Sequence, residues 1–526
     1  MNALAVLFAG RLAPQALEPV FSGKNALDLA LEQSRRFPGV SKILLLAEEG
    51  GRCPSALPDG VPVLRRPEWT KQSLLECLAA EGAGFDLSYF AWADCPFLDP
   101  LLTGAVAERH LRYAAEYSYA DGWPYGFAPE LLSPGTAGIL AKINGGDEGP
   151  VERDGLFSVL QKDINAFDIE TEISAVDLRC HRLCLAADSK RNLLLLARWA
   201  EAAGGLPDAA SAAELVEKRP GLLRTLPAFY PIQVSGPCPQ ACQICPYPHH
   251  GKGFPPVTER RDFMDTAVFS DLLDRIAAFS GDAVIDLSLW GELALHPRKT
   301  DLIGEVLARR ELSLVIETSG IGWRQEELEG AAKAAAAAPG RPGSPPPLSW
   351  IVSLDAFDEG RYRELRGPGF TEALSCARTL FSLFPAGAYV QAVRTEGAED
   401  DIEKFYRSWK DAAPRGVPSI IIQKYDDFCG ALPKRQASDI SPVIRRPCWH
   451  IMRDFPVLID GTVPLCREEL SCLERPVRED GRVLGNIFSE SLEEIWSHGE
   501  AFYEEHCGKQ YAGLCAGCDE YYTYNF

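Results

Sequence analysis

The amino-acid sequence predicts an α/β protein of about three domains. Its 526 residues correspond to three domains at roughly 100–200 residues each. Short apolar strands alternate with helical stretches over residues 1–205 and again from residue 230, which is typical of parallel or mixed sheets. The 16 cysteines are unevenly distributed, with three inside residues 238–245 and seven inside residues 429–526. Such clustering indicates metal ligands.

Charge and hydrophobic pattern argue against several classes of protein. Lys and Arg number 53 and Asp and Glu number 74, so the net charge of −21 disfavours a nucleic-acid or anionic-membrane surface. No run of 18 apolar residues predicts a membrane helix. The opening MNALAVLFAG is better interpreted as a buried strand than as a signal peptide, because Arg11 stands where a cleavage site would be. We therefore expect a cytoplasmic protein whose clustered cysteines bind metal, with disulfides as the less favoured alternative.

The first predicted domain spans residues 1–205. Its apolar strands are expected at residues 5–8, 42–47 and 87–93, with a helix at about residues 26–37. An Ala/Glu/Leu-rich stretch, residues 206–228, is expected to be a helical connector. Six cysteines outside the two clusters are interpreted as small core residues: Cys53, Cys77, Cys95, Cys180, Cys184 and Cys376.

The second predicted domain, residues 229–428, repeats the alternation of strand and helix about six times. Its strands are expected at residues 232–234, 284–289, 312–316, 350–354, 388–393 and 419–423. This pattern predicts a (β/α) barrel or a partial (β/α)6 barrel, whose chemistry belongs at the C-terminal ends of the strands. The Ala- and Pro-rich stretch 331–347 is expected to be a surface insertion without function. Residues 429–526 form a third, irregular and cysteine-rich domain.

The strongest chemical signal is the loop that contains Cys238, Cys242 and Cys245. Its C-x3-C-x2-C spacing supplies three thiolates directly after a predicted strand. Structural zinc takes four ligands, and an electron-transfer [4Fe–4S] cluster usually takes four cysteines. Three cysteines would leave one iron of a [4Fe–4S] cluster open to another ligand. A zinc site completed by His249 or His250 is the alternative.

This loop resembles that of the radical S-adenosylmethionine (AdoMet) superfamily. The resemblance implies that the open iron chelates the methionyl amine and carboxylate of AdoMet. Electron transfer, from a donor such as flavodoxin or ferredoxin, would then cleave AdoMet to a 5′-deoxyadenosyl radical that abstracts a hydrogen atom. Trp290 stands where the family's Gly-Gly-Glu motif has its first glycine. The resemblance assigns AdoMet contacts to Ile244, Gly291, Glu292, Ser353 and Asp355.

The C-terminal cysteines supply two further pairs of thiolates. Cys448-x17-Cys466 and Cys515-x2-Cys518 together suffice for a four-coordinate site, and an Asp-Gly turn within residues 459–463 predicts a hairpin that brings the first pair together. The spacing resembles SPASM and shorter "twitch" domains, and it implies one auxiliary [4Fe–4S] cluster at these four cysteines. Zinc is the alternative, because spacing alone does not distinguish the metals. Cys429, Cys472 and Cys507 remain unassigned.

The N-terminal domain resembles cytidylyltransferases with a nucleotide-diphospho-sugar transferase fold. The resemblance assigns Asp94 to the metal that bridges the nucleotide phosphates and makes Arg11 and Lys24 candidate phosphate ligands. The loop after the first strand lacks the run of small residues that lets phosphate approach the backbone, which favours a retained fold without catalysis. The whole chain resembles an uncharacterised radical AdoMet family described from spirochaetes.

Two functional hypotheses follow. The first is a radical AdoMet enzyme that acts on an unidentified glycan, sugar nucleotide or peptide, without nucleic-acid or membrane partners. The second is a sugar cytidylyltransferase whose C-terminal half is a non-radical Fe–S redox or scaffold module.

Overall fold

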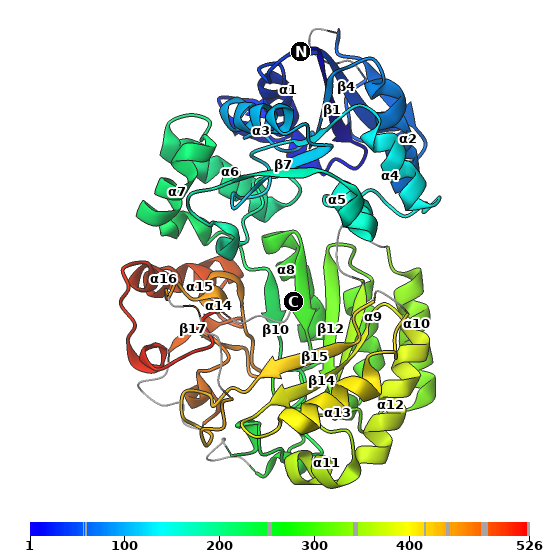
Figure 1. Ribbon diagram of the computed structural model, residues 1–526. Coiled ribbons are helices and arrows are strands. Elements are labelled where there is room, and N and C mark those ends of the chain that lie inside the picture. The colour runs from blue at the N-terminus through cyan, green and yellow to red at the C-terminus, as the bar shows by residue number, and fades with distance from the viewer. Residues whose placement is uncertain are drawn as a thin grey trace. The chain divides into compact units, whose positions relative to one another are not determined.

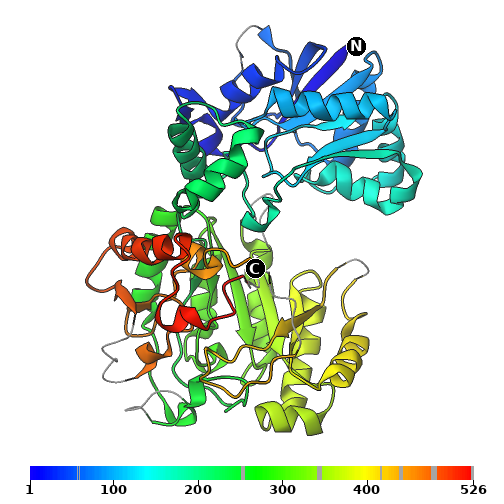
Figure 2. The same ribbon diagram turned by 60° about the vertical axis from the view of Figure 1, so that its left-hand side comes forward.

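The computed structural model describes residues 1–55, 57, 60–249, 255–339, 346–414, 417–437, 442, 444–474 and 482–522. The chain forms two compact units, Met1–Thr225 and Leu226–Phe526 (Figures 1 and 2). The boundary lies inside the stretch expected to be a connector. His250 and residues 340–345 of the expected insertion lie outside the described residues. Within the described residues, no helix is long and apolar enough to cross a membrane.

The first unit is built on a seven-stranded mixed sheet in the order β5-β4-β1-β6-β8-β7-β9. Strands β1, β4, β5 and β6 are parallel, whereas β8 runs antiparallel to β6 and β7. All residues of β1 are buried, as expected for a strand covered on both faces. The strands are β1 (Ala3–Ala9), β2 (Pro19–Phe21), β3 (Lys24–Asn25), β4 (Val40–Glu48), β5 (Val63–Arg66), β6 (Leu87–Trp92), β7 (Tyr117–Asp121), β8 (Glu130–Leu132) and β9 (Ile169–Ile173).

Side-chain caps define where several helices of this unit begin. Asn25 accepts a hydrogen bond from Asp28 N at the start of α1, and Asp99 accepts from Leu101 N and Leu102 N at the start of α3. The helices are α1 (Ala26–Ser34), α2 (Lys71–Gly82), α3 (Pro100–Arg112), α4 (Thr136–Asn144), α5 (Gly155–Leu160), α6 (Lys190–Ala203) and α7 (Ala209–Lys218). One expectation about the cysteines is wrong, because Cys180 is exposed rather than buried in a core.

The second unit contains a six-stranded, fully parallel sheet whose strands follow the order of the sequence, β10 to β15. This confirms the predicted α/β partial barrel. The strands are β10 (Phe229–Pro231), β11 (Ala283–Asp286), β12 (Leu312–Thr318), β13 (Leu348–Ser353), β14 (Ala388–Arg394) and β15 (Ile420–Lys424). The helices are α8 (Thr266–Ser280), α9 (Lys299–Leu307), α10 (Gln325–Ala337), α11 (Glu359–Arg366), α12 (Phe370–Leu383) and α13 (Glu399–Trp409).

The two faces of this sheet differ in chemistry. Ile285, Leu314, Trp350 and Val390 share one buried core with residues of the surrounding helices. Because neighbouring residues of a strand point to opposite faces, the next positions point away from those helices. We call this second side the inner face. Its residues include Asp286, Glu317, Ser353 and Gln391, so polar groups lie where the chemistry of a barrel is expected.

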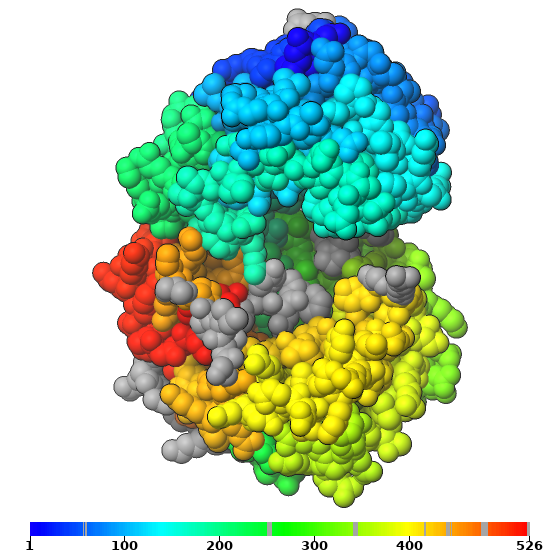
Figure 3. All heavy atoms as spheres, viewed as in Figure 1, coloured from blue at the N-terminus to red at the C-terminus, as the bar shows by residue number. Residues whose placement is uncertain are grey.

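The C-terminal segment of the second unit packs on the first strand of the barrel. Isolated bridges join Phe229 to Asp454 and Ile232 to Val457. The segment contains α14 (Trp449–Arg453), β16 (Thr462–Pro464), β17 (Val483–Asn486), α15 (Leu492–His498) and α16 (Glu500–Cys507). Its surface is orange to red in Figure 3, with α13 in yellow.

The hairpin expected at residues 459–463 is present only as a turn. Leu458 N donates to Thr462 O (2.8 Å) across this turn. Strand β16 then pairs antiparallel with β17 instead of with the residues before the turn. Val457, just before the turn, is bridged to Ile232 of the barrel.

Candidate active site and auxiliary cysteine site

The three-cysteine loop follows β10 and brings its thiols together. Burial raises the pKa of Cys238 and Cys242, and it raises the pKa of Cys245 to about 12. The charge of Cys242 further raises the pKa values of the other two thiols, so the three cysteines lie within electrostatic range of one another. A bound metal would lower these thiol pKa values, because thiolates bind metals while protonated thiols do not. The donor set therefore fits a cluster with three cysteine ligands.

The end of α11 holds this loop in place. Gln243 N donates to Leu365 O (2.9 Å), and Gln240 Nε2 donates to Tyr362 Oη (3.0 Å). Arg366 Nε donates to Gln240 Oε1 (3.2 Å), so its positive charge lies beside the loop. That charge lowers the pKa of Cys242 against the larger opposite effect of burial.

Gly291 is forced against the three-cysteine loop. It has φ +74°, and a Cβ atom at this position would lie 1.8 Å from Ser235 O. Glu292 N donates to Pro237 O (2.9 Å), directly before Cys238. Only glycine can adopt this left-handed backbone conformation so close to Ser235 O. This explains why the motif has a glycine at position 291.

Trp290, the departure from the family motif, also has a left-handed backbone, with φ 49°. Its ring stacks on Tyr247, with centroids 5.8 Å apart, and contacts Phe428 at 5.8 Å. A non-glycine residue in this region of φ is strained, and the aromatic contacts offset part of that cost. The tryptophan therefore preserves the backbone turn that a glycine would otherwise provide.

The buried carboxylate of Glu292 is oriented by the end of β12. Glu292 Oε1 accepts from Thr318 Oγ1 (2.7 Å) and Ala294 N (3.1 Å), and Oε2 accepts from Ser319 N (2.8 Å). Oε2 retains acceptor capacity, since a carboxylate oxygen has two lone-pair sites and Oε2 accepts only one of these hydrogen bonds. The Thr-Ser pair thus positions Glu292 beside the cysteines.

The other residues assigned to AdoMet lie at the end of β13 and in the loop. Asp355, with φ 57°, accepts from Val393 N (2.8 Å) and forms a buried ion pair with Arg366. Ser353 Oγ donates to Glu317 Oε1 (2.5 Å). Ile244 lies half-buried directly before Cys245. Contact of these residues with AdoMet stays a prediction.

The four C-terminal cysteines assigned to the auxiliary cluster lie within electrostatic range of one another in the second unit. Burial raises the pKa of Cys466, and the charges of Cys448, Cys518 and Cys515 raise it further. Arg482 Nη1 donates to Cys515 Sγ (3.5 Å), and Glu520 N donates to Cys518 Sγ (3.4 Å). These donors would stabilise thiolates.

Cys429 is a fifth thiol at this place, and the sequence did not assign it. A hydrogen bond with Cys518 raises the pKa of Cys429 and lowers that of Cys518. Cys429 follows β15 and has φ 55°. The sequence separation of 89 residues gave no signal for this contact. Cys472 and Cys507 interact instead with the nearby carboxylates of Glu469 and Glu504.

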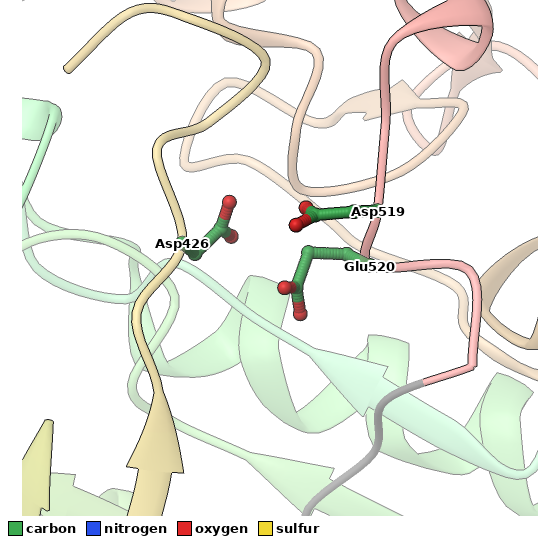
Figure 4. A group of neighbouring side chains, drawn as sticks. All are labelled: Asp426, Asp519 and Glu520. Atoms are coloured by element: carbon green, nitrogen blue, oxygen red, sulfur yellow. The ribbon is translucent and has the colours of Figure 1, made fainter. Parts of the chain in front are cut away.

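A group of acids joins the end of β15 to the C-terminal segment. The carboxylates of Asp426, Asp519 and Glu520 lie within 4.8 Å of one another, on two facing segments (Figure 4). Lys424 Nζ pairs with Asp519 (2.9 Å) and Glu520 (2.6 Å), and Arg467 pairs with Asp426 (3.4 Å). Two cations thus offset part of the negative charge of the three acids. The ion pairs of Lys424 join the segment that carries Cys518 to the end of β15.

In the first unit, Asp94 lies at the end of β6 and is bound by an arginine. Arg153 donates through Nη1 (3.1 Å) and Nη2 (2.7 Å) to the carboxylate of Asp94, and Nη2 also contacts Asp188 (2.9 Å). The side chain of Asp94 is 3% exposed. Arg153 is distant in sequence, so no local pattern predicted this pair.

Arg11 and Lys24 pair with other acids. Arg11 contacts Glu48 (3.4 Å) and Glu68 (3.1 Å), and Lys24 contacts Glu32 (2.6 Å). These contacts do not join the two basic residues to Asp94. Their assignment to a nucleotide stays a prediction.

Comparison with known proteins shows which family the chain belongs to. Residues 448–519 match the SPASM family, described as an iron-sulfur cluster-binding domain. A curated "Uncharacterized protein" of Treponema pallidum (strain Nichols) is 35% identical over 378 residues, which is 70% of this chain and 98% of that protein. The chain belongs to the family of this treponemal protein.

The domain match confirms the predicted SPASM-type iron–sulfur domain. Together with the three-cysteine loop on the partial barrel, it identifies an enzyme of the radical AdoMet type. Among solved structures, the chain is similar to Streptococcus suis SuiB bound to precursor peptide SuiA, at 13% identity and TM-score 0.40, over 65% of this chain and 77% of SuiB. It is also similar to a cytidylyltransferase from Leptospira borgpetersenii serovar Hardjo-bovis (strain JB197), at 17% identity and TM-score 0.34, over 42% of this chain and 95% of the other.

Proposed function

We propose that this enzyme cleaves AdoMet reductively at a [4Fe–4S] cluster held by Cys238, Cys242 and Cys245. When bound, the cluster would supply the single electron for AdoMet cleavage, and the 5′-deoxyadenosyl radical that this cleavage releases would abstract the hydrogen atom. The observation that carries the proposal is the close approach of Gly291 to Ser235 O, which sets Glu292 against a loop of exactly three thiols. Three thiolates leave one iron open, and Glu292 is an acceptor for an ammonium group next to it.

The remaining residues of the site hold these groups in place. Arg366 joins the loop to Asp355, because it donates to Gln240 Oε1 (3.2 Å) and pairs with the Asp355 carboxylate. Apolar side chains pack beside the cysteines and exclude water: Tyr247, Val257, Leu289, Leu458, Leu470 and Leu473. Ile244, Ser353 and Asp355 are proposed to contact AdoMet.

A single auxiliary [4Fe–4S] cluster is proposed at Cys448, Cys466, Cys515 and Cys518. The meeting of these four thiols in the second unit supports the assignment. The cluster would conduct electrons or bind substrate. We further propose a cytoplasmic enzyme with a flavodoxin or ferredoxin as electron donor and a small-molecule or peptide substrate.

The test is AdoMet turnover by anaerobically reconstituted protein reduced with dithionite. We expect methionine and 5′-deoxyadenosine, with about eight irons per chain for two [4Fe–4S] clusters. Cys242→Ser should abolish both products, whereas Cys77→Ser, a buried cysteine of the first unit, should leave them unchanged. An intact cluster without AdoMet cleavage would refute the proposal, and stoichiometric zinc would refute the C-terminal assignment.

The alternative, sugar cytidylyltransfer by the first unit, gains no support from Asp94. A carboxylate that bridges metal and phosphate must be accessible, whereas both oxygens of Asp94 accept from Arg153. A Cys242→Ala protein that coupled CTP to a sugar phosphate at the wild-type rate would favour that alternative.

A further inference from the structure

Three polar side chains of the inner face form a cluster of hydrogen-bond acceptors. They are Asp286 on β11, Glu317 on β12 and Gln391 on β14, and we call them the acceptor group (strands β12 and β14 are labelled in Figure 1). Gln391 Nε2 donates to Glu317 Oε1 (2.7 Å), and Ser353 Oγ donates to the same oxygen (2.5 Å). These two contacts fix the orientation of Glu317.

The carboxamide of Gln391 leaves one acceptor without a donor. Gln391 is 2% exposed, and its Oε1 has no hydrogen-bond partner among the described residues. Rotating the amide would place Oε1 against the Glu317 carboxylate and lose the bond from Nε2, so this orientation is fixed by chemistry. A buried carbonyl oxygen without a donor is costly, and it indicates a site that a ligand hydroxyl or N–H fills.

Asp286 adds a second carboxylate with spare acceptor capacity. Within the described residues, its hydrogen bonds come from Ser288 alone, including Ser288 N at 3.0 Å. Asp286 and Glu317 lie on adjacent strands and on the same face, and each carboxylate is half-buried. Two neighbouring carboxylates at one partly accessible place favour a bound cation.

The cationic residue that faces Asp286 is already engaged. Arg467 contributes positive charge near Asp286. Its guanidinium pairs with Glu468 (3.1 Å) and Asp426 (3.4 Å). These two acids engage Arg467. Burial, and to a lesser extent the charge of Glu317, raise the pKa of Asp286 to about 7, and a cation bound between the two carboxylates would favour its charged form.

The acceptor group lies beside the residues proposed to contact AdoMet. Ser353 Oγ donates to Glu317 Oε1 (2.5 Å), and Thr318, the residue after Glu317, donates to the Glu292 carboxylate (2.7 Å). Glu292 in turn lies against the three-cysteine loop, because its N–H donates to Pro237 O (2.9 Å). A substrate must approach the loop closely for hydrogen transfer, because reacting atoms have to lie about 3–3.5 Å apart. The acceptor group is therefore placed to hold a substrate and to orient it.

We propose that Asp286, Glu317 and Gln391 bind the substrate, and that this substrate carries a primary ammonium group and a neighbouring hydrogen-bond donor. The ammonium lies between the two carboxylates, and the neighbouring donor bonds to Gln391 Oε1. Both an amino sugar and a lysine side chain of a peptide offer this ammonium chemistry. The inference rests on the proposed function, because it places the substrate next to the AdoMet cluster.

The test measures binding by calorimetry to the anaerobic, reconstituted enzyme loaded with AdoMet. The probes are glucosamine against glucose, and Nα-acetyl-lysine amide against Nα-acetyl-norleucine amide. At least one ammonium probe should bind about tenfold or more tightly than its neutral match, as expected for a charge-assisted contact. The probe that shows this preference identifies the source of the ammonium group. Equal binding, or no binding, of both pairs refutes the inference.

Two variants make the result specific. Asp286→Asn should remove the preference for the ammonium probe, while Glu311→Gln, an exposed acid at the opposite end of β12, should retain it. If Asp286→Asn instead weakens AdoMet as much as the ammonium probe, the acceptor group serves AdoMet and the inference is wrong. Failure of the proposed function is distinguishable, since wild-type protein would then form no 5′-deoxyadenosine.

Discussion

Replacing Gly291 by alanine tests how the AdoMet motif is held against the three-cysteine loop. The added Cβ would lie 1.8 Å from Ser235 O, whereas real Cβ atoms essentially never approach closer than 3.0 Å. The backbone must therefore move by at least 3.0 − 1.8 = 1.2 Å. In addition, alanine at φ +74° costs roughly 1–2 kcal/mol relative to a right-handed conformation.

The displacement passes directly to the groups that we propose bind AdoMet. Glu292 is the next residue, and its N–H is bonded to Pro237 O, one residue before Cys238. A shift of this size breaks that hydrogen bond and moves the Glu292 carboxylate. We expect AdoMet to bind about tenfold or more weakly to Gly291→Ala, which corresponds to a loss of about 1.4 kcal/mol or more.

The assay is equilibrium binding of AdoMet to reconstituted protein, with iron content and circular dichroism measured on the same samples. Gly304→Ala is the matched control, because Gly304 lies in α9 with nothing within 4 Å of the added Cβ. This control should bind AdoMet normally and gain stability of roughly 0.5–1 kcal/mol. Wild-type AdoMet affinity in folded, iron-loaded Gly291→Ala would refute the reasoning.

Three further substitutions test single interactions by urea unfolding of the full chain. Arg366→Gln leaves a buried carboxylate unpaired and should cost about 3–5 kcal/mol, and a change below 1 kcal/mol would contradict the buried pair. Burial lowers the pKa of His110 to about 4, so the folded state resists protonation and stability is lost as pH falls from about 6.5 towards 4. Wild type should therefore lose about 2 kcal/mol more than His110→Gln between pH 7 and pH 5, and equal losses would contradict this. Arg153→Leu should destabilise the chain by about 3–5 kcal/mol by orphaning Asp94, whereas the exposed Arg179→Leu should cost less than about 1 kcal/mol; equal effects would refute the distinction.

The barrel was predictable because its parallel strands are buried between helices on one side and neighbouring strands at their edges. Such strands appear in a sequence as short apolar runs, as in residues 312–316 of β12. Strands with a polar alternation gave no such run, and β9, whose sequence is IETEI, was not predicted. The first barrel strand was expected at residues 232–234, whereas β10 spans Phe229–Pro231, and Ile232 bridges Val457 of the C-terminal segment.

The three-cysteine loop was predictable because its three thiols are close in sequence. Contacts between distant segments gave no such signal. The pairing of Asp94 with Arg153 spans 59 residues, and the contact of Cys429 with Cys518 spans 89 residues. The acceptor group was missed for the same reason: Asp286, Glu317 and Gln391 meet only through strand register.

The most direct test of the central claim is the electron paramagnetic resonance spectrum of the dithionite-reduced protein before and after addition of AdoMet. A cluster with three cysteine ligands has an open iron, so AdoMet should bind there and shift the signal of that cluster. The same addition should leave the signal of the C-terminal cluster unchanged, because four cysteines complete its coordination. A spectrum that does not respond to AdoMet at saturating concentration, in protein with full iron content, would contradict the account.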